Sequence, residues 1–461
     1  MKKILRLLLH LVLWGLLSAF GVYCWLFFPI ISGYVAKKTC SEVFLAGRTP
    51  GDIRTREFSF PFSLVRFRVD SADSSVSASI LGLARRKAIY RKGLGATLVS
   101  GVSEAELRSQ RAGLARLPGY SQDTIDWPMG DRVADTPVAE VDLARLDSAV
   151  ASAFADTVHH TDRGTRAVIV VYHGQIVAER YAPGFTARTP LLGWSMAKSI
   201  TNAMIGVLVR QQGLDIRSPA PVAAWQADPR KAITWQQLMQ MTSGLRFHWF
   251  PAGPSDLTNM LFKEKDMAGF AAGLPLQAPP GSRFLYSDGN ANILCRLIRD
   301  RLGDSAYYRF PYEEIFYPAG MLHTTLEPDA AGNFVGCSYC YATARDWARF
   351  GLLYLNDGVA GGRRILPEGW VKWTVSPSGV HNNEDGNGEY GALWWVNAGR
   401  EGHSDWRRFH RLPLDAYSCQ GFDGQYIIVV PSKKLVVVRL SLEKGYLDPG
   451  NFAADVAAAL K

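Results

Sequence analysis

The stretch GWSMAKSI occupies residues 193–200 and decides how the rest of the chain is interpreted. It contains a serine, Ser195, followed three residues later by Lys198. The pattern Ser-x-x-Lys is loose, and about one match is expected by chance in a chain of this length and ordinary composition. A second match is present at Ser441 and Lys444. The surroundings of the two matches therefore have to decide between them.

Ser195 lies at the start of an expected helix, whereas Ser441 does not. Apolar residues follow Ser195 at helical spacing, and Gly213 is placed to end the helix. On a helix, Ser195 and Lys198 share one face, so the lysine amine can hydrogen-bond the serine hydroxyl. A serine at the first turn can also offer its backbone N–H to an oxyanion. Ser441 follows an apolar strand and is expected in a loop.

A Ser–Lys pair usually needs further help to move a proton. Lys198 can accept the proton of Ser195 only if its amine is neutral or paired with another base, and burial beneath a substrate lowers the pKa of an amine. Tyr286 precedes a helix-like run and can shuttle a proton if a cationic lysine lowers its pKa. Considered alone, such a tyrosine is more often a buried side chain with a satisfied hydroxyl.

Strand patterns enclose this region at both ends. Residues 166–171 and 175–179 predict a hairpin with its turn at His173-Gly174, and residues 425–430 and 434–439 predict a second hairpin. Helices are expected over residues 143–154 and from about Asn451. Strands at the two ends and helices between them indicate one sheet closed by both ends of the region, with a helical part inserted.

The N-terminal residues predict a membrane anchor. Lys2, Lys3 and Arg6 precede an apolar run from Leu7 to about Val35. The run exceeds both the roughly 20 residues that cross a bilayer and the apolar core of about 7–15 residues of a cleavable signal. We expect an uncleaved anchor over residues 1–36 with its N-terminus in the cytoplasm; a cleaved signal peptide is the alternative. Lys37 and Lys38 on the far side weaken the assignment of orientation.

The positive charge is concentrated beside this anchor. The net charge is +9, and residues 1–130 hold 18 Lys and Arg against 9 Asp and Glu, whereas the remainder holds 33 of each. This favours contact with anionic lipid over an acidic substrate. No nucleic-acid-binding motif accompanies the charge, so we expect no nucleic-acid partner. The oligomeric state does not follow from the sequence.

Three further regions follow the anchor. Residues 37–118 alternate in strand fashion around positions 63–69, 76–80 and 87–91, and predict a small β-rich segment without chemistry of its own. Residues 119–137 are rich in Pro, Gly and Asp and predict a linker. Residues 138–461 form the expected catalytic region.

Metal and cofactor sites are not expected. Cys337 and Cys340 form a CxxC, but no second pair or histidine cluster completes a metal site. Chance is the leading explanation of this pair, and a disulfide in an oxidising compartment is the alternative. The pair His159-His160 lacks a third ligand at suitable spacing. No Gly-x-Ser-x-Gly elbow and no phosphate-binding loop is present.

Five pieces in order carry a family resemblance. From Val138 onward the chain resembles the serine β-lactamase and penicillin-recognising family in its class C-like branch, and is most similar to the 6-aminohexanoate-dimer hydrolases and related esterases. The pieces are SMAK at 195–198, LMQMTSGL at 238–245, Pro280-Gly281 leading into Tyr286-Ser287, ARDWARFG at 344–351 and GFDGQ at 421–425. The resemblance implies an α/β (α+β) fold, an antiparallel sheet flanked by helices with an inserted all-helical region.

The resemblance also implies roles for individual residues. Ser195 corresponds to the acylated nucleophile, Lys198 to its partner and Tyr286 to the general acid and base. The oxyanion site would combine the N–H of Ser195 with one from a strand edge. The substrate and oxyanion residues implied in this way are Asp288, Cys419, Gly421 and Phe422.

Two departures from the family pattern narrow the expected activity. The third motif is usually Lys or His, Thr or Ser, then Gly, but the nearest positions here read Ala416-Tyr417-Ser418. The second motif is usually Tyr-x-Asn, but position 288 is Asp. We expect a membrane-anchored periplasmic serine hydrolase of the inner membrane that acts on a small-molecule amide or ester. The alternatives are a β-lactamase or penicillin-binding peptidase, and a catalytically silent envelope receptor or scaffold.

Overall fold

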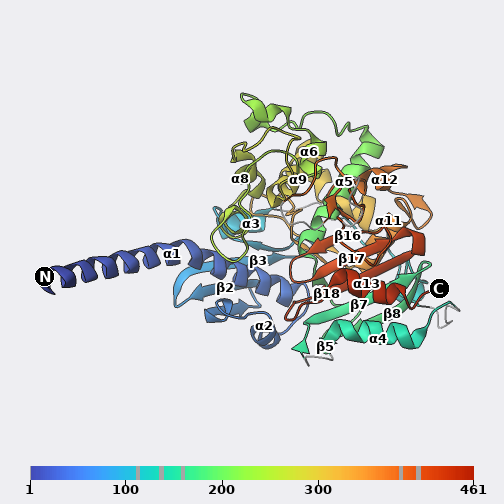
Figure 1. Ribbon diagram of the computed structural model, residues 1–461, viewed down its shortest axis with the longest axis horizontal. Helices are drawn as coiled ribbons and strands as arrows, with labels where there is room; N and C mark the ends of the chain where they lie inside the picture. The colour runs from blue at the N-terminus through green and yellow to red at the C-terminus, as the bar shows by residue number, and fades with distance from the viewer. Residues whose placement is uncertain (1, 111–114, 134–139, 157–160, 384–387, 401–405) are drawn as a thin grey trace. The chain divides into compact units, whose positions relative to one another are not determined.

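The computed structural model describes residues 2–110, 115–133, 140–156, 161–383, 388–400 and 406–461 (Figure 1). The pair His159-His160 and the expected boundary at Val138 lie outside these residues. The chain divides into two units: unit 1 comprises residues 1–110, 248–266 and 329–331, and unit 2 comprises residues 111–247, 267–328 and 332–461. The expected boundaries after residues 36, 118 and 137 stay predictions. The structure adds that residues 248–266, from within the expected catalytic region, group with the N-terminal residues.

Unit 1 contains a four-stranded antiparallel sheet in which the strands follow their order in the chain. The alternation seen in the sequence sets its two faces, since Val65 and Phe67 are buried and Arg66 and Arg68 are exposed. The strands are β1 (Val65–Asp70), β2 (Ser75–Ile80), β3 (Leu83–Arg91) and β4 (Gly95–Leu98). The β-rich character expected of this segment is therefore confirmed.

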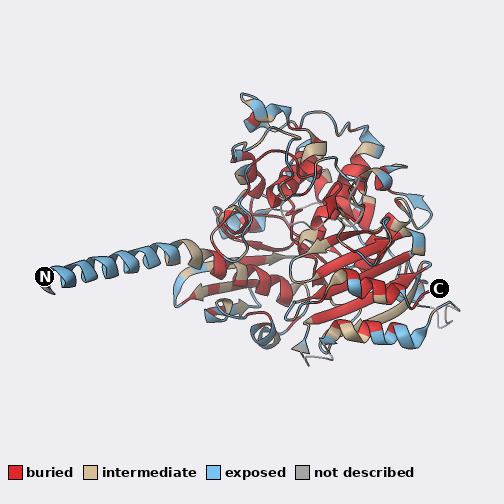
Figure 2. Ribbon diagram, in the orientation of Figure 1, coloured by how far each residue is buried: buried red, intermediate tan, exposed pale blue. Residues whose placement is uncertain are grey.

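The buried face of this sheet packs against the helix that contains the expected anchor. Helix α1 (Lys2–Phe44) is long and apolar enough to cross a membrane. Figure 2 shows that its first half is exposed, whereas the half from Ile30 onward is buried. Ile31, Val35 and Cys40 join the core of unit 1. The helix α7 (Asp256–Lys263), from the inserted residues 248–266, also contacts α1.

The helix α1 continues past residue 36, the expected end of the anchor, and its basic residues beyond that point lie inside unit 1. Lys37 and Lys38 are each 4% exposed. The Nζ of Lys38 lies 2.9 Å from Glu57, and Arg48 bonds Glu42 and Glu57. Buried charges are tolerated when they are paired in this way. Lys37 and Lys38 therefore belong to the interior of unit 1, so they no longer count against the orientation of the anchor.

Unit 2 is built on a seven-stranded antiparallel sheet in the order β14-β15-β16-β17-β18-β7-β8. The two predicted hairpins are confirmed, and β18 pairs with β7, so the two hairpins from opposite ends of the region meet inside the sheet. Both faces are covered by helices, which explains why β7, β17 and β18 are buried throughout. The strands are β7 (Thr165–Tyr172), β8 (Gln175–Tyr181), β14 (Glu389–Tyr390), β15 (Trp395–Val396), β16 (Tyr417–Gly421), β17 (Gln425–Val430) and β18 (Leu435–Ser441).

Different helices cover the two faces of this sheet. The helices α4 (Leu143–Phe154) and α13 (Pro449–Ala457) share a core with alternate sheet residues such as Val170 and Val437. The helix α11 (Ala344–Leu355) packs on β17 and β18 from the other face, where Gly351 approaches Val436. The architecture is thus the predicted α/β (α+β) one.

The end of the stretch at residues 193–200 forms the first turn of an inserted helix. Helix α5 (Ala197–Gln212) ends at Gly213, whose φ of 62° suits a left-handed cap, as the sequence predicts. It contacts α9 (Asp288–Leu302), which in turn contacts α6 (Trp235–Met239) and α8 (Met267–Gly273). One expectation is corrected here: Ser441 is the buried last residue of β18 and does not lie in a loop, because β18 continues to pair with β7 up to that position.

The described part of the expected linker is bonded to unit 2. The Trp127 indole donates to the carbonyl of Gly174 at 2.8 Å, and the Gln122 amide donates to the carbonyl of Gly320 at 2.6 Å. The buried Arg349 guanidinium reaches Asp131 at 2.7 Å. Residues 122–131 are therefore held by specific contacts.

We expect Gly351→Ala to destabilise the protein even though alanine favours helices. A Cβ at this position would meet Val436 Cγ1 at 2.5 Å and Ile427 Cγ2 at 2.9 Å. Overpacking costs about 1–3 kcal/mol, whereas Gly→Ala gains at most roughly 1 kcal/mol in a helix. Gly273→Ala in α8 is the control, because nothing lies within 4 Å of its Cβ position. Urea unfolding should rank Gly351→Ala below the parent and Gly273→Ala level with it or above; equal stabilities of the two variants would contradict the packing.

Candidate active site

Ser195 lies in a tight turn that leads into α5. The 3-10 turn η3 (Trp194–Met196) precedes the helix, and Trp194 has a φ of 47°, a left-handed conformation that is costly for a bulky residue. The N–H of Gly193 donates to the carbonyl of Cys340 at 2.9 Å, which fixes the entry to this turn. Ser195 is half-buried, whereas its neighbours on both sides are buried. The turn therefore presents the serine side chain and little else.

The ammonium group of Lys198 donates to acceptors from three parts of the chain. Its Nζ donates to Ser195 Oγ at 2.8 Å, to Asp288 Oδ1 at 2.9 Å and to the carbonyl of Cys337 at 3.0 Å. The side chains of Lys198 and Asp288 are 1% and 2% exposed. The expected Ser195–Lys198 hydrogen bond is present, and the structure adds a buried ion pair that the spacing of the sequence did not indicate.

The buried carboxylate of Asp288 determines the charge state of Lys198. Burial lowers the pKa of its amine, but interactions with neighbouring groups, of which the charge of Asp288 is the largest, together raise the pKa further than burial lowers it. The net pKa lies above the ordinary value for lysine, so the amine is protonated at neutral pH. Of the two conditions named for proton transfer to Lys198, a neutral amine or an amine paired with another base, this arrangement does not provide the neutral amine, and the carboxylate of Asp288 is the physical reason.

Tyr286 lies against the same two side chains. It hydrogen-bonds Ser195 and Lys198, and the Nζ of Lys198 is 4.8 Å from the centre of its ring. The ring stacks on Trp395 at 5.6 Å and meets Tyr390 edge-on at 6.2 Å. Burial raises the pKa of Tyr286 and outweighs the lowering by Lys198, so the net pKa is above the ordinary value. The expectation that a cationic lysine lowers this pKa is met only as a partial offset.

Asp288 lies in the first turn of α9, after the N-cap Ser287, where a carboxylate is favoured. The resemblance placed this residue among those that contact substrate or oxyanion. In the structure it is buried and bonds the ammonium of Lys198. A carboxylate in this place can hold the lysine in position and keep it charged.

The end of strand β16 lies beside the backbone of Ser195. A Cβ on Gly421 would stand 2.1 Å from the Gly193 carbonyl oxygen and 3.1 Å from the Ser195 nitrogen, so the approach requires glycine. The backbone N–H of Ser195 and the strand end expected to supply a second donor therefore lie close together, as an oxyanion site requires. Phe422 follows as a 48% exposed side chain whose ring meets Trp194 edge-on at 6.0 Å.

Cys419 differs from these neighbours because it points into the protein. It is 2% exposed, and burial raises the pKa of its thiol to about 12. The Gln420 amide donates to Ser418 Oγ at 2.8 Å, so polar atoms of this strand bond one another. The structure thus brings Ser195, Lys198, Tyr286, Asp288, Gly421 and Phe422 together, and leaves Cys419 as a buried strand residue.

The CxxC segment contributes backbone atoms to the site. Cys337 and Cys340 are free and buried, so the alternative of a disulfide is not what the structure contains. The carbonyl of Cys337 accepts from Lys198, and that of Cys340 accepts from Gly193. Sequence reasoning missed this role because carbonyl groups leave no residue-type signal. It also missed Arg408, whose guanidinium lies 4.3 Å from the ring of Trp395.

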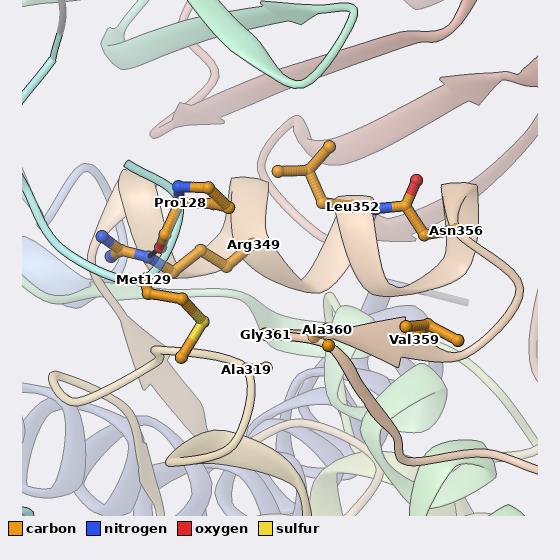
Figure 3. Close-up of a pocket in the computed structure, with 10 residues that line it drawn as sticks. Pro128, Met129, Ala319, Arg349, Leu352, Asn356, Val359, Ala360 and Gly361 are labelled. Atoms are coloured by element: carbon orange, nitrogen blue, oxygen red, sulfur yellow. Dashed lines mark hydrogen bonds between the residues drawn. The ribbon is translucent and has the colours of Figure 1, made fainter. Parts of the chain in front are cut away.

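A small cavity of unit 2 lies elsewhere. Its volume is ≈ 180 Å³, and Met129, Arg349, Leu352 and Val359 are among its lining residues (Figure 3). Neither Ser195 nor any residue that bonds it contributes to the lining. The cavity therefore does not mark the candidate active site.

We expect Asp288→Ala to lower the free energy of unfolding by about 3–5 kcal/mol, because removing one partner of a buried ion pair leaves the other charge uncompensated. Lys198→Met combined with Asp288→Leu removes both charges and should recover most of that loss. Urea unfolding of the two proteins beside the parent measures both effects. A single variant as stable as the parent would show that the pair is not buried as described.

Several known proteins are similar to this chain. Residues 150–460 match the family model described as Beta-lactamase. The 6-aminohexanoate-dimer hydrolase of Paenarthrobacter ureafaciens is 23% identical over 311 residues, which cover 60% of this chain and 72% of that protein. An uncharacterized protein of Alkalihalophilus pseudofirmus is 27% identical over 116 residues, and the match covers 25% of this chain and 34% of that protein. A putative 6-aminohexanoate-dimer hydrolase from Bacillus anthracis has a solved structure with a TM-score of 0.53 and 24% identity, covering 75% of this chain and 88% of that one. The chain belongs to the beta-lactamase family, whose members are in general serine hydrolases.

Proposed function

We propose that this protein hydrolyses amide or ester bonds through an acyl-enzyme on Ser195. The observation that carries the proposal is the contact of Lys198 Nζ with Ser195 Oγ at 2.8 Å, made by an ammonium that a buried carboxylate holds in place. An ammonium can only donate, so the hydroxyl proton of Ser195 is left free to point to the Tyr286 oxygen. The three side chains form one continuous hydrogen-bonded set beside an oxyanion site.

Acylation can proceed through this set without a neutral lysine. The Oγ of Ser195 attacks the substrate carbonyl carbon, and its proton passes to the oxygen of Tyr286. Tyr286, which is neutral because its pKa is raised, gives its own proton to the departing nitrogen or oxygen. The Oγ–C bond forms as the C–N or C–O bond breaks. The ammonium of Lys198 stabilises the negative charge that develops on Oγ.

Deacylation would reverse the same proton path. A water molecule takes the place of the leaving group, gives a proton to Tyr286 as it attacks the acyl carbon, and Ser195 regains a proton as it departs. The N–H of Ser195 and the end of β16 at Gly421 would receive the oxyanion in both steps. No group outside the described set is needed for the balance of protons.

The substrate side of the site favours an uncharged acyl group. Strand β16 supplies no cationic side chain where the family usually has one, and the exposed ring of Phe422, which meets the buried Trp194 edge-on, offers aromatic surface instead. The likeness to a 6-aminohexanoate-dimer hydrolase supports an amide substrate, and the set of Ser195, Lys198 and Tyr286 would serve an ester equally. The function of a β-lactamase or penicillin-binding peptidase is less favoured than that of an amidase or esterase. A catalytically silent receptor is disfavoured by the complete hydrogen-bonded set.

We further propose that α1 remains attached and anchors the protein in the inner membrane, with unit 2 in the periplasm. Residues from Ile30 onward form part of the core of unit 1, so cleavage within that half of the helix would remove core residues. Lys2, Lys3 and Arg6 precede the exposed apolar half, which favours a cytoplasmic N-terminus.

We expect a fluorophosphonate probe to add one phosphonyl group to the intact protein, and Ser195→Ala to abolish the mass shift. The probe reports a serine whose proton can be removed beside an oxyanion site. Ser441→Ala, at the other Ser-x-x-Lys match, is the control and should be labelled like the parent. If Ser195→Ala is labelled as fast as the parent, Ser195 is not the nucleophile.

A panel of p-nitrophenyl esters, linear amides and nitrocefin then identifies the substrate class, and we expect nitrocefin to be the poorest substrate of the three.

We expect Gly421→Ala to lower kcat/KM for the best p-nitrophenyl ester by about 10²–10³-fold, the usual cost of losing an oxyanion donor. The added Cβ would overlap the Gly193 carbonyl oxygen and push β16 away from Ser195. Gln420→Ala, one residue earlier on the same strand, is the control and should retain most of the activity. Thermal unfolding checks that both variants fold. Unchanged kinetics in a folded Gly421→Ala would exclude this strand end from the oxyanion site.

A further inference from the structure

Unit 1 exposes large apolar side chains at one end of its sheet. Phe60 is 78% exposed, Leu64 46%, Leu81 74% and Leu83 60%. We call these four residues the apolar rim. Single exposed apolar residues are common on protein surfaces, whereas a group of them marks a surface that contacts something.

The register of the strands places Leu64, Leu81 and Leu83 together, and Phe60 precedes Leu64 by four residues. Val65 pairs with Ile80, and Ile80 pairs with Leu83. Leu64 directly precedes Val65, and Leu81 directly follows Ile80, so both lie at the same end of the sheet as Leu83. The rim therefore joins the start of β1 to the turn between β2 and β3.

The turn between β2 and β3 has an unusual residue at its tip. Leu81 has a φ of 50° and is followed by Gly82 at 79°. Two-residue hairpin turns with positive φ at both positions favour Asn, Asp or Gly, because a branched side chain is strained there. Here the first position is an exposed leucine. Neither the turn geometry nor the interior of unit 1 accounts for an apolar side chain at this position.

The rim lies at the end of the sheet from which the exposed half of α1 departs. Near its C-terminus, α1 places Phe44 on Tyr90, at the far end of β3, with ring centres 5.7 Å apart. Ten residues earlier, Tyr34 lies against Phe62, just before β1, with ring centres 4.7 Å apart. Because α1 runs along the sheet from the Phe62 end to the Tyr90 end, its preceding residues leave the sheet beside the rim. Figures 1 and 2 show the exposed part of α1 emerging at that end.

The exposed part of α1 has the length of a membrane span. From Ile4 to Trp25 its large apolar side chains are exposed, and at about 1.5 Å per residue this stretch extends about 33 Å, close to the roughly 30 Å of a hydrocarbon core. Tyr23 and Trp25 at its end are the residue types that favour the membrane interface. The rim lies beside the turns of α1 that follow Trp25, close to where the head groups begin.

Basic side chains lie beside the rim on the outer face of the sheet. Arg66 and Arg68 follow Leu64 on β1, and Arg85 follows Leu83 on β3; all three are exposed. Arginine close to a bilayer is attracted to anionic head groups by about 1 kcal/mol each. Apolar tips with flanking arginines fit an anionic lipid surface better than a second copy of this basic unit.

We propose that the apolar rim inserts into the interface of the bilayer that α1 crosses, and that Arg66, Arg68 and Arg85 contact its anionic head groups. The proposal rests on the membrane anchoring proposed above and goes beyond it. A single helix would leave unit 1 free to tilt and rotate about its axis. A second point of contact fixes the orientation of unit 1 on the membrane surface.

Spin labels on the full-length protein in nanodiscs of neutral and anionic phospholipid test this placement. Cys24→Ser provides the background, because the other five cysteines are buried. Three positions are labelled after substitution by cysteine: Leu81 in the rim, Leu13 in the span, and Lys92 in the β3–β4 turn at the opposite end of the sheet. Power saturation compares exposure of each label to oxygen, which concentrates in lipid, and to a water-soluble nickel chelate.

We expect the ratio of oxygen to nickel accessibility to be several-fold higher at Leu81 than at Lys92, and highest at Leu13. A Leu81 label as open to nickel as the Lys92 label overturns the proposal while leaving the anchor intact. A Leu81 label shielded from both reagents means that protein covers the rim, which also overturns it. A Leu13 label open to nickel instead refutes the anchoring on which the proposal rests.

Discussion

The buried ion pair between Lys198 and Asp288 is the interaction on which the candidate site depends. Neither charge is stable alone at 1% and 2% exposure, since transfer of one unpaired ion from water costs several kcal/mol. Together they place an ammonium 2.8 Å from Ser195 Oγ, and the third proton is accepted by the carbonyl of Cys337. Each acceptor comes from a different part of the chain. The geometry of the site is therefore a consequence of unit 2 being folded.

The pair also determines which chemistry is available to Tyr286. If Lys198 were neutral it could accept the proton of Ser195 directly, and Tyr286 would be secondary. Asp288 keeps the amine charged, so the oxygen of Tyr286, which lies against both Ser195 and Lys198, is the group placed to receive the proton. The replacement of the usual Asn by Asp in the second motif is thus consistent with the same machinery working through tyrosine. The Asp at position 288 therefore bears on the proton path of the proposed mechanism as well as on the choice of substrate.

Local sequence patterns predicted much of the fold. Period-2 alternation and the His173-Gly174 turn identified the hairpins, and the helical spacing up to Gly213 identified α5, because these features depend on neighbours in sequence. The ion pair could not be predicted, because Lys198 and Asp288 are separated by long stretches of chain and meet only through packing of α5 on α9. The contribution of Cys337 and Cys340 was missed because it uses backbone carbonyls. Membership of residues 248–266 in unit 1 has no signal in composition.

Helix α1 unites two roles that sequence reasoning had separated. The apolar run was interpreted as an anchor that stops near residue 36, followed by an independent small segment. In the structure the same helix continues to Phe44, and its second half supplies core residues such as Val35 and Cys40 to unit 1. Lys37 and Lys38 lie between these two residues and are buried, and Lys38 forms an ion pair with Glu57. An anchor built into a core in this way cannot swivel on a flexible joint, so any tilt of α1 in a bilayer would be transmitted directly to the sheet that packs on it.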